Sequence, residues 1–322
     1  MGHRVTEVTG EGTVEVGTGV DYLMELSSLV SRESACSLPG VNIKRDSFMT
    51  VMRRAQSRGY VKDHHAAFVE EGLRHGFTVG FNRDKFKGKR VFSNYPTAEA
   101  ARSQVTAAIQ ARVVKGRTVQ LGPWNQVRSQ LDALTDKYAV FPIGAVDKAS
   151  DPSVKRPTDD HTRTGFNHAT EMDQLRHSLN TYAEVAWLLC QNYFMYVSDV
   201  EDAFLLIPLA PWLWFFFLFR YYESDDAKQQ TTAVHITGDF GAAGMPGTFK
   251  IFFVDVVIQM ARSELVLTVP MSVYVDDCGA MDSWTPVRST LTLKSFSSRN
   301  GRSRCAGSSS RRLRTDAVRS GN

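Results

Sequence analysis

Cysteine is scarce in this sequence, and the few cysteines are scattered. Cys36, Cys190, Cys278 and Cys305 form no C-x-x-C pair and have no clustered histidines beside them. This spacing argues against a zinc ribbon and against a disulfide framework, which need paired or densely placed cysteines. It fits a reducing compartment, so we expect an intracellular protein of the nucleus or cytoplasm.

A cleavable signal peptide and a membrane-spanning run are also lacking. The first 19 residues are polar and rich in Gly, Val, Thr and Glu. The most apolar stretch, 205–219, is too short to span a bilayer and contains Pro208 and Pro211. We therefore expect this stretch to be a buried strand in the core, and we expect no membrane partner.

Charge of one sign is not in large excess either. The 322 residues carry a net charge of +4, with 43% hydrophobic and 22% charged residues, which is typical of a globular protein. Residues 294–322 contribute +7, from seven Arg, one Lys and one Asp, so the rest sums to about −3. This basic Ser/Arg-rich tail either helps to hold nucleic acid or is simply disordered.

Apolar spacing and helix-ending residues divide the rest of the chain. The first 40 residues lack convincing periodicity and are expected to be a disordered leader, and 41–125 to be a helical N-terminal region. In the second of these regions, Asp at the start and Gly at the end mark two short helices. The helices expected along the chain are 46–59, 63–76, 97–115 and 172–190.

Three short motifs in the second half carry the chemistry. An apolar strand over 193–199 ends on Asp199, a helix begins near Pro246, and a hairpin turns at Asp276-Asp277. The order strand, helix, strand, strand predicts a ferredoxin-like β-α-β-β sheet backed by helices, within the α/β (α+β) class. In such a sheet the end of the first strand lies next to the tip of the hairpin.

Three carboxylates at one place repel each other unless a cation lies between them. Asp199, Asp276 and Asp277 are therefore candidate catalytic residues and ligands of two Mg²⁺ ions, with Mn²⁺ as a substitute. Taken alone, Asp199 is better explained as an Asp that ends a strand than as a metal ligand. The Asp276-Asp277 pair is likewise explained as an ordinary turn.

Together the motifs resemble the palm of retroviral and retrotransposon reverse transcriptases. The resemblance lies in Asp-Val-Glu-Asp-Ala-Phe at 199–204, Gly241-x4-Pro246-x2-Phe249, and Tyr-Val-Asp-Asp at 274–277. It implies an RNA-directed DNA polymerase that extends a DNA primer on an RNA template with dNTPs, alongside other proteins of the retroelement. It also implies that the Val200 carbonyl is a further metal ligand, that Gly241 and Pro246 shape the nucleotide site, and that Tyr274 contacts template and primer.

The resemblance extends more weakly toward the N-terminus. Pro-Ile-Gly-Ala-Val-x-Lys at 142–148 and Lys-Arg-Pro at 155–157 are similar to the fingers segment, which implies that Lys148 and Arg156 hold the nucleotide phosphates. A solvated loop is the alternative for both cations. Blocks at 71–77 and 116–124 look like those of retrotransposons that carry tyrosine recombinases. The implied regions are fingers-like over 126–198, palm over 199–290 and a disordered basic tail over 291–322.

Phe204 stands where the family places a ring beneath the sugar of the incoming nucleotide. A large ring there would collide with a 2′-hydroxyl, which implies selection of dNTPs; the alternative is one more core aromatic. No thumb pattern follows Met281, so we expect a C-terminally truncated polymerase with the thumb missing. The alternatives are an inactive remnant that folds and at most binds nucleic acid, and a viral RNA-templated RNA polymerase.

Overall fold

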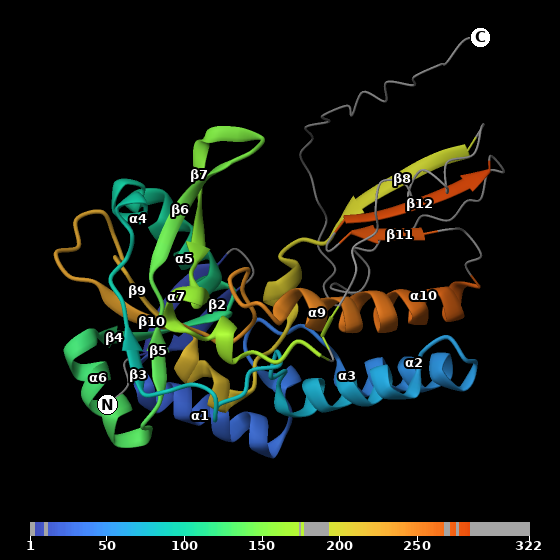
Figure 1. The fold of residues 1–322 in the computed structure, drawn as a ribbon, viewed down its shortest axis with the longest axis horizontal. Coiled ribbons are helices and arrows are strands. Elements are labelled where there is room, and N and C mark those ends of the chain that lie inside the picture. The colour runs from blue at the N-terminus through green and yellow to red at the C-terminus, as the bar shows by residue number, and fades with distance from the viewer. Residues whose placement is uncertain are drawn as a thin grey trace, which may run out of the picture. The chain divides into compact units, whose positions relative to one another are not determined.

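A five-stranded mixed sheet collects strands from a large part of the chain (Figure 1). The computed structural model describes residues 4–9, 12–173, 175–176, 193–266, 271–274 and 277–283. The sheet has the order β3-β5-β9-β10-β4, in which β5 is parallel to β3 and β9, and the other pairs are antiparallel. Its strands are β3 (Lys89–Val91), β4 (Thr118–Pro123), β5 (Tyr138–Val140), β9 (Leu218–Tyr221) and β10 (Thr231–His235).

This sheet joins segments that the sequence assigned to different regions. β3 and β4 come from the expected helical region, β5 from the expected fingers, and β9 and β10 from the expected palm. The mixed α/β class is thus confirmed, while the five-stranded sheet itself was not expected. Strands paired across so many residues leave no periodic signal that indicates their partners.

Helices account for much of the N-terminal half. They are α1 (Gly19–Arg32), α2 (Arg45–Ser57), α3 (Asp63–His75), α4 (Pro96–Ala100), α5 (Arg102–Val114), α6 (Trp124–Leu134) and α7 (His161–Thr164), with short 3₁₀ turns η1 (Ala35–Ser37) and η2 (Asn167–Ala169). The expected helices 46–59 and 63–76 are confirmed as α2 and α3. Helix α3 ends as predicted, because Gly76 has a φ of 86° that glycine adopts without strain. The expected helix 172–190 lies mostly outside the described residues.

The expectation of disorder over residues 1–40 is wrong for much of this segment. Strands β1 (Arg4–Thr9) and β2 (Gly12–Gly17) form an antiparallel hairpin, and α1 follows. Helix α1 buries one stripe, consisting of Val20, Leu23, Leu26 and Val30. Spacings of three and four residues place these side chains on one helical face, a pattern that the sequence contains.

The single helix expected over 97–115 is two helices that meet at Ala101. Each half packs against a different partner. Thr97 of α4 accepts a hydrogen bond from the Ala145 amide, whereas Thr106 of α5 donates one to the Tyr222 carbonyl. Helix α5 buries Val105, Ile109 and Val113, which recur every four residues on one face.

A long hairpin projects from the part of the molecule that carries the sheet (Figure 1). It consists of β6 (Ile143–Lys148) and β7 (Asp151–Asp159), which pair antiparallel from Ile143 opposite Asp159 to Lys148 opposite Asp151. The chain reverses between the two strands at residues 149–150. The base of the hairpin is buried, while most of its outer part is exposed.

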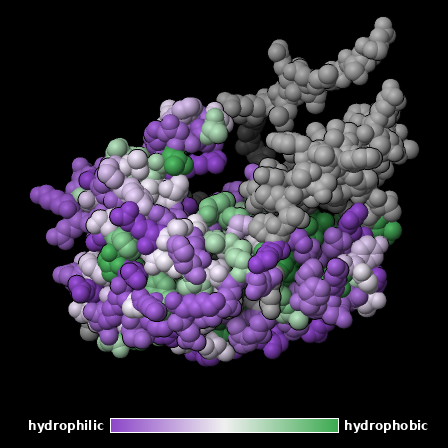
Figure 2. Space-filling view, viewed as in Figure 1, coloured by the Kyte–Doolittle hydropathy of each residue, from purple (hydrophilic) through white to green (hydrophobic). Residues whose placement is uncertain are grey.

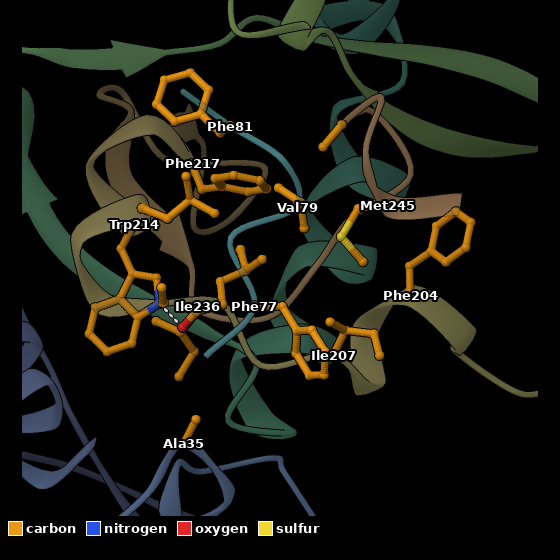
Figure 3. Close-up of a cluster of buried hydrophobic side chains, with 14 of the residues drawn as sticks. Ala35, Phe77, Val79, Phe81, Phe204, Ile207, Trp214, Phe217, Ile236 and Met245 are labelled. Atoms are coloured by element: carbon orange, nitrogen blue, oxygen red, sulfur yellow. Dashed lines mark hydrogen bonds between the residues drawn. The ribbon is translucent and has the colours of Figure 1, made fainter. Parts of the chain in front are cut away.

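The apolar stretch 205–219 is buried, as expected, but it is mainly 3₁₀ helix rather than strand. It contains the end of η3 (Ala203–Leu206), all of η4 (Pro211–Phe216) and the start of β9. Trp214 lies in its centre and donates its indole N–H to the Leu209 carbonyl at 3.1 Å (Figure 3). By contrast, the molecular face in Figure 2 is largely hydrophilic. No helix among the described residues is long and apolar enough to cross a membrane.

The helix that begins near Pro246 contains an unusual wide segment. It starts as α9 (Met245–Phe249), continues as a π-helix, η5 (Lys250–Val257), and ends as α10 (Ile258–Leu265). Lys250 and Asp255, five residues apart, form an ion pair at 2.7 Å. Pairing at this spacing fits the wider π turn. Phe252 of the π segment stacks on Phe48 of α2.

A second sheet contains the acidic motifs. Strands β8 (Tyr193–Asp199), β11 (Met271–Tyr274) and β12 (Asp277–Ser283) pair antiparallel in the order β11-β12-β8. The strand expected over 193–199 and the hairpin after residue 270 are therefore confirmed. Val275 and Asp276 lie outside the described residues, as does the tail 291–322.

Candidate functional site

Two of the three predicted catalytic carboxylates occupy paired positions. Asp199 at the end of β8 is the register partner of Asp277 at the start of β12. Asp199 is exposed, and directly opposed residues of antiparallel strands are close neighbours. The sequence therefore predicted correctly that these acidic positions, far apart in the chain, meet at one edge of a sheet. Asp276, the third, lies outside the described residues.

The other residues of these two motifs have been placed only in part. Tyr274 is the register partner of Asp277 across the hairpin. Val200 follows β8 directly and is partly buried against the core. The predicted roles of the Val200 carbonyl in metal binding and of Tyr274 in contacting template and primer stay predictions.

Asp199 and Asp202, at the start of the turn and within it, differ in their surroundings. Asp202 has a left-handed φ of 57°, which Asp tolerates better than most residues. Its carboxylate accepts hydrogen bonds from Lys115 Nζ at 2.6 Å and from Arg117 Nη1. Burial alone would raise the pKa of Asp202, but the bonds from Lys115 and Arg117 outweigh burial and lower it. Asp202 is thus neutralised by two cations, and Asp199 is left as the exposed acid that ends the strand.

The two predicted phosphate-binding cations share the projecting hairpin. Lys148 ends β6, and Arg156 lies on β7 opposite Val146. Arg156 is exposed and Lys148 is partly exposed. Within the described parts of the chain, neither side chain forms a salt bridge or a hydrogen bond. Both cations are therefore available to an anionic ligand or to solvent.

Phe204 is more deeply placed than the predicted sugar contact requires. Only 4% of it is exposed, and it belongs to the same buried cluster as Val79 and Met245 (Figure 3). Its ring centre lies 4.8 Å from that of Phe240, of which 59% is exposed. The exposed aromatic surface at this place thus belongs to Phe240. The burial favours the alternative interpretation of Phe204 as a core aromatic that supports Phe240.

Gly241 lies in a closely packed loop, and Pro246 follows this loop at the start of the π-containing helix. A Cβ atom on Gly241 would lie 1.9 Å from the Asp159 carbonyl oxygen, and one on Gly244 would lie 1.8 Å from the Val79 carbonyl oxygen. Only glycine permits such close approach of two backbones. Pro246 lies in the first turn of α9, as predicted, where its missing amide hydrogen costs nothing. We call residues 239–244 the glycine loop.

The glycine loop packs on a buried polar network that was not expected from the sequence. Its members come from α5, the end of β7, α7, the end of β10 and the glycine loop; they are Arg112, Asp159, His161, His235 and Asp239. In one half of the network, Arg112 Nη1 lies 3.4 Å from Asp159 Oδ2 and 3.2 Å from His235 Nε2. In the other half, His161 Nε2 lies 2.7 Å from Asp239 Oδ2, and both side chains are fully buried.

Burial and neighbouring charges shift the pKa values in this network in different directions. Burial raises the pKa of Asp159, and Arg112 offsets this only in part. Burial also drives the pKa of His235 well below its usual value, with Arg112 adding to the effect. For Asp239, burial alone would raise the pKa, but His161 and the Gly241 amide lower it to about 2. Asp239 is therefore an anion at neutral pH, and His235 is neutral.

Three members of the network are spaced like metal ligands. One ligand atom each from Asp159, His235 and Asp239 lies within 4.8 Å of the others, so the cluster could hold a metal ion. The Arg112 guanidinium, however, already approaches two of these three residues. It supplies the positive charge that the carboxylates need. A mixed nitrogen and oxygen set is also less suited to Mg²⁺ than carboxylates alone.

Sequence reasoning missed this network for a physical reason. His161 and Asp239 are 78 residues apart, and His235 and Thr118, which share a 2.7 Å hydrogen bond, are 117 apart. Neither spacing belongs to a local motif. The one available signal was Asp239 itself, an acidic residue that stands two positions before Gly241.

Comparison with known protein families finds no family model that matches the chain, and comparison with curated proteins finds no significant match.

Proposed function

We propose that this chain is a nucleotidyltransferase of the polymerase palm type. The observation that carries the proposal is the pairing of Asp199 with Asp277 on adjacent antiparallel strands. These two positions are 78 residues apart in the chain. The sequence motifs had identified each of them as a candidate ligand of Mg²⁺. Acidic positions brought together at the edge of a sheet are the expected basis of a divalent-ion site.

The donor set at this edge suits Mg²⁺. Carboxylate oxygens are the hard ligands that Mg²⁺ prefers, and Asp199 is exposed where an ion and its substrate can reach it. Asp199 and Asp277, together with Asp276, which precedes Asp277 in the chain, would hold two ions. When bound, such ions activate a 3′-hydroxyl and stabilise the leaving pyrophosphate.

Other residues of the chain would then bind and position the substrate. Lys148 and Arg156, which form no salt bridge among the described residues, would bind the nucleotide triphosphate. Asp202 would keep the turn after Asp199 in place through Lys115 and Arg117, outside the metal site. The exposed ring of Phe240, backed by Phe204, would lie against the nucleotide.

The finer assignment is an RNA-directed DNA polymerase of a retrotransposon. Its support is the resemblance of the motifs at 199–204, 241–249 and 274–277 to those of reverse transcriptases. This assignment implies an RNA template, a DNA primer and dNTPs as partners.

Primer extension tests the proposal. The unmodified chain is expected to extend a DNA primer on an RNA template in the presence of Mg²⁺ and dNTPs. Asp199→Asn and Asp277→Asn should abolish extension. Glu201→Gln is the matched control, because this neighbouring side chain is 88% exposed and is assigned no role in the reaction. Full extension by Asp199→Asn would refute the site. A chain that binds template in a salt-sensitive way but never extends would be the inactive remnant instead.

A further inference from the structure

The glycine loop is held by one buried carboxylate. Asp239 Oδ1 accepts hydrogen bonds from the Gly241 amide at 2.9 Å and from the Ala242 amide at 3.1 Å. A charged acceptor makes such bonds shorter and stronger than a neutral acceptor does. The first turn of the loop is thus organised around Asp239.

The second oxygen of the same carboxylate connects the loop to another segment. Asp239 Oδ2 accepts a hydrogen bond from Nε2 of His161, which opens helix α7 immediately after β7. The His161 ring is enclosed by aromatic rings, with ring centres 4.4 Å from Phe141 and 4.6 Å from Phe217. His161 Nδ1 is buried and has no hydrogen-bond partner in the described part of the chain. Among the described residues, the bond to Asp239 is therefore the one polar contact of this ring.

Backbone contacts reinforce the same connection. Gly241 lies against the Asp159 carbonyl, at the base of the β6–β7 hairpin. Asn167 bridges the loop from the other side, because its amide nitrogen donates to the Gly241 carbonyl and its amide oxygen accepts from the Ala243 nitrogen. The hairpin base and the glycine loop therefore share one packed interface.

We propose that the His161–Asp239 pair is a positioning element that couples the β6–β7 hairpin to the glycine loop. Through this pair, the cations at the outer part of the hairpin and the loop beside Phe240 keep a fixed relation to each other. The functional consequence rests on the proposed nucleotidyl transfer: one segment would bind the phosphates and the other would contact the rest of the nucleotide. His161 and Asp239 themselves would touch no substrate.

Hydrogen exchange on the full chain tests the coupling without any reaction. His161→Phe should fit the aromatic surroundings but leave Asp239 without its partner. We expect faster exchange of the Gly241 and Ala242 amides and, at the same time, of the hairpin amides in 143–148. His75→Phe, at an exposed histidine on α3, is the matched control and should change neither. Faster exchange in the loop with an unchanged hairpin would overturn the proposal.

Two substitutions at Asp239 keep the test informative if one variant folds poorly. Asp239→Asn retains an oxygen acceptor for both loop amides and an amide group opposite His161, so exchange in both segments should stay within about threefold of the unmodified chain. Asp239→Ala removes every acceptor and should release both segments together. If Asp239→Asn exchanges as fast as Asp239→Ala, the pair does not act through these hydrogen bonds and the proposal is wrong.

Kinetics separate this proposal from the proposed function. In single-nucleotide extension, His161→Phe should raise KM for the nucleotide by roughly tenfold and change kcat much less, because the loss is one of substrate positioning. An unchanged KM in an active enzyme would contradict the positioning role. If the unmodified chain shows no extension at all, the proposed function fails, while hydrogen exchange still decides the coupling.

Discussion

Asp277 lies directly opposite Asp199 on neighbouring antiparallel strands, although 77 residues separate them in the chain. Asp202, three residues after Asp199, is bound instead by Lys115 and Arg117. Similar side chains in one short motif thus have different partners.

Asp202→Asn should weaken the fold without changing the metal requirement. The substitution removes the negative charge opposite two cations, of which Arg117 is largely buried, so we expect a loss of about 1–3 kcal/mol in the free energy of unfolding. Urea unfolding of the variant and of Glu201→Gln measures this difference. The Mg²⁺ concentration for half-maximal extension should be unchanged, and a large increase would make Asp202 a metal ligand.

The stability of the protein should fall as the pH drops below about 6.5. The pKa of His235 is well below its usual value in the folded chain, so below pH 6.5 the unfolded chain binds a proton that the folded chain does not. The slope is at most about 1.4 kcal/mol per pH unit for one proton. Asp159 acts in the opposite direction, because its raised pKa favours proton uptake by the folded chain. The lowered pKa of Asp239 reduces the stability only at lower pH, as the pH falls from the usual pKa of Asp to about 2.

Unfolding measured between pH 5 and 8 in the unmodified chain and in His235→Gln isolates this effect. The glutamine side chain can still bond to Thr118 but does not titrate. The free energy of unfolding of the unmodified chain, relative to that of His235→Gln, should therefore fall as the pH is lowered. Parallel curves would show that His235 is not the group responsible.

Arg112→Ala should destabilise the chain strongly in the absence of added metal. The substitution leaves Asp159 buried without its cation, and breaking a buried pair in this way costs about 3–5 kcal/mol. It also vacates space between Asp159 and His235. We expect Zn²⁺ to raise the melting temperature of Arg112→Ala but not that of the unmodified chain. An equal increase in both would mean that the cluster binds metal beside Arg112.

Phe204→Ala and Phe240→Ala should have separate effects. Phe204 is buried, so its truncation should cost about 3–5 kcal/mol of stability. Phe240 is mostly exposed, so its truncation should cost little, but it removes the ring that a nucleotide sugar can meet. We therefore expect Phe240→Ala to increase the use of ribonucleotides in primer extension. Unchanged sugar selection in Phe240→Ala, together with loss of selection in a folded Phe204→Val variant, would assign the contact to Phe204.

The local sequence pattern was sufficient to predict the strands and helices that carry the proposed chemistry. The strand ending at Asp199 and the hairpin near Asp277 follow from apolar runs that end in acidic turn residues, and helices α2 and α3 follow from their Asp and Gly boundaries. These signals lie within about 15 residues. Secondary structure of this kind is set by neighbours in the chain.

The pairing of strands that lie far apart in the chain could not be predicted from local pattern. Nothing in β9 or β10 indicates that they join β4 and β5 in a five-stranded sheet rather than the sheet of Asp199. The network around Asp239 depends on side chains from five separate segments, so no spacing in the sequence identifies it. Helix α1 is a different case, because its apolar stripe was present and was overlooked among polar neighbours.

The π-helical segment η5 also fixes how α10 is oriented about its own axis. Because each residue of an α-helix turns the chain by about 100°, deleting one residue from 250–257 would rotate everything that follows by about that angle. Glu264, which binds Arg54 and Arg58 of the α2 region, would then face away from them, and buried Met260 would turn toward solvent. The wide turn therefore acts as a spacer whose length is matched to the salt bridges beyond it, and shortening it should separate α10 from α2.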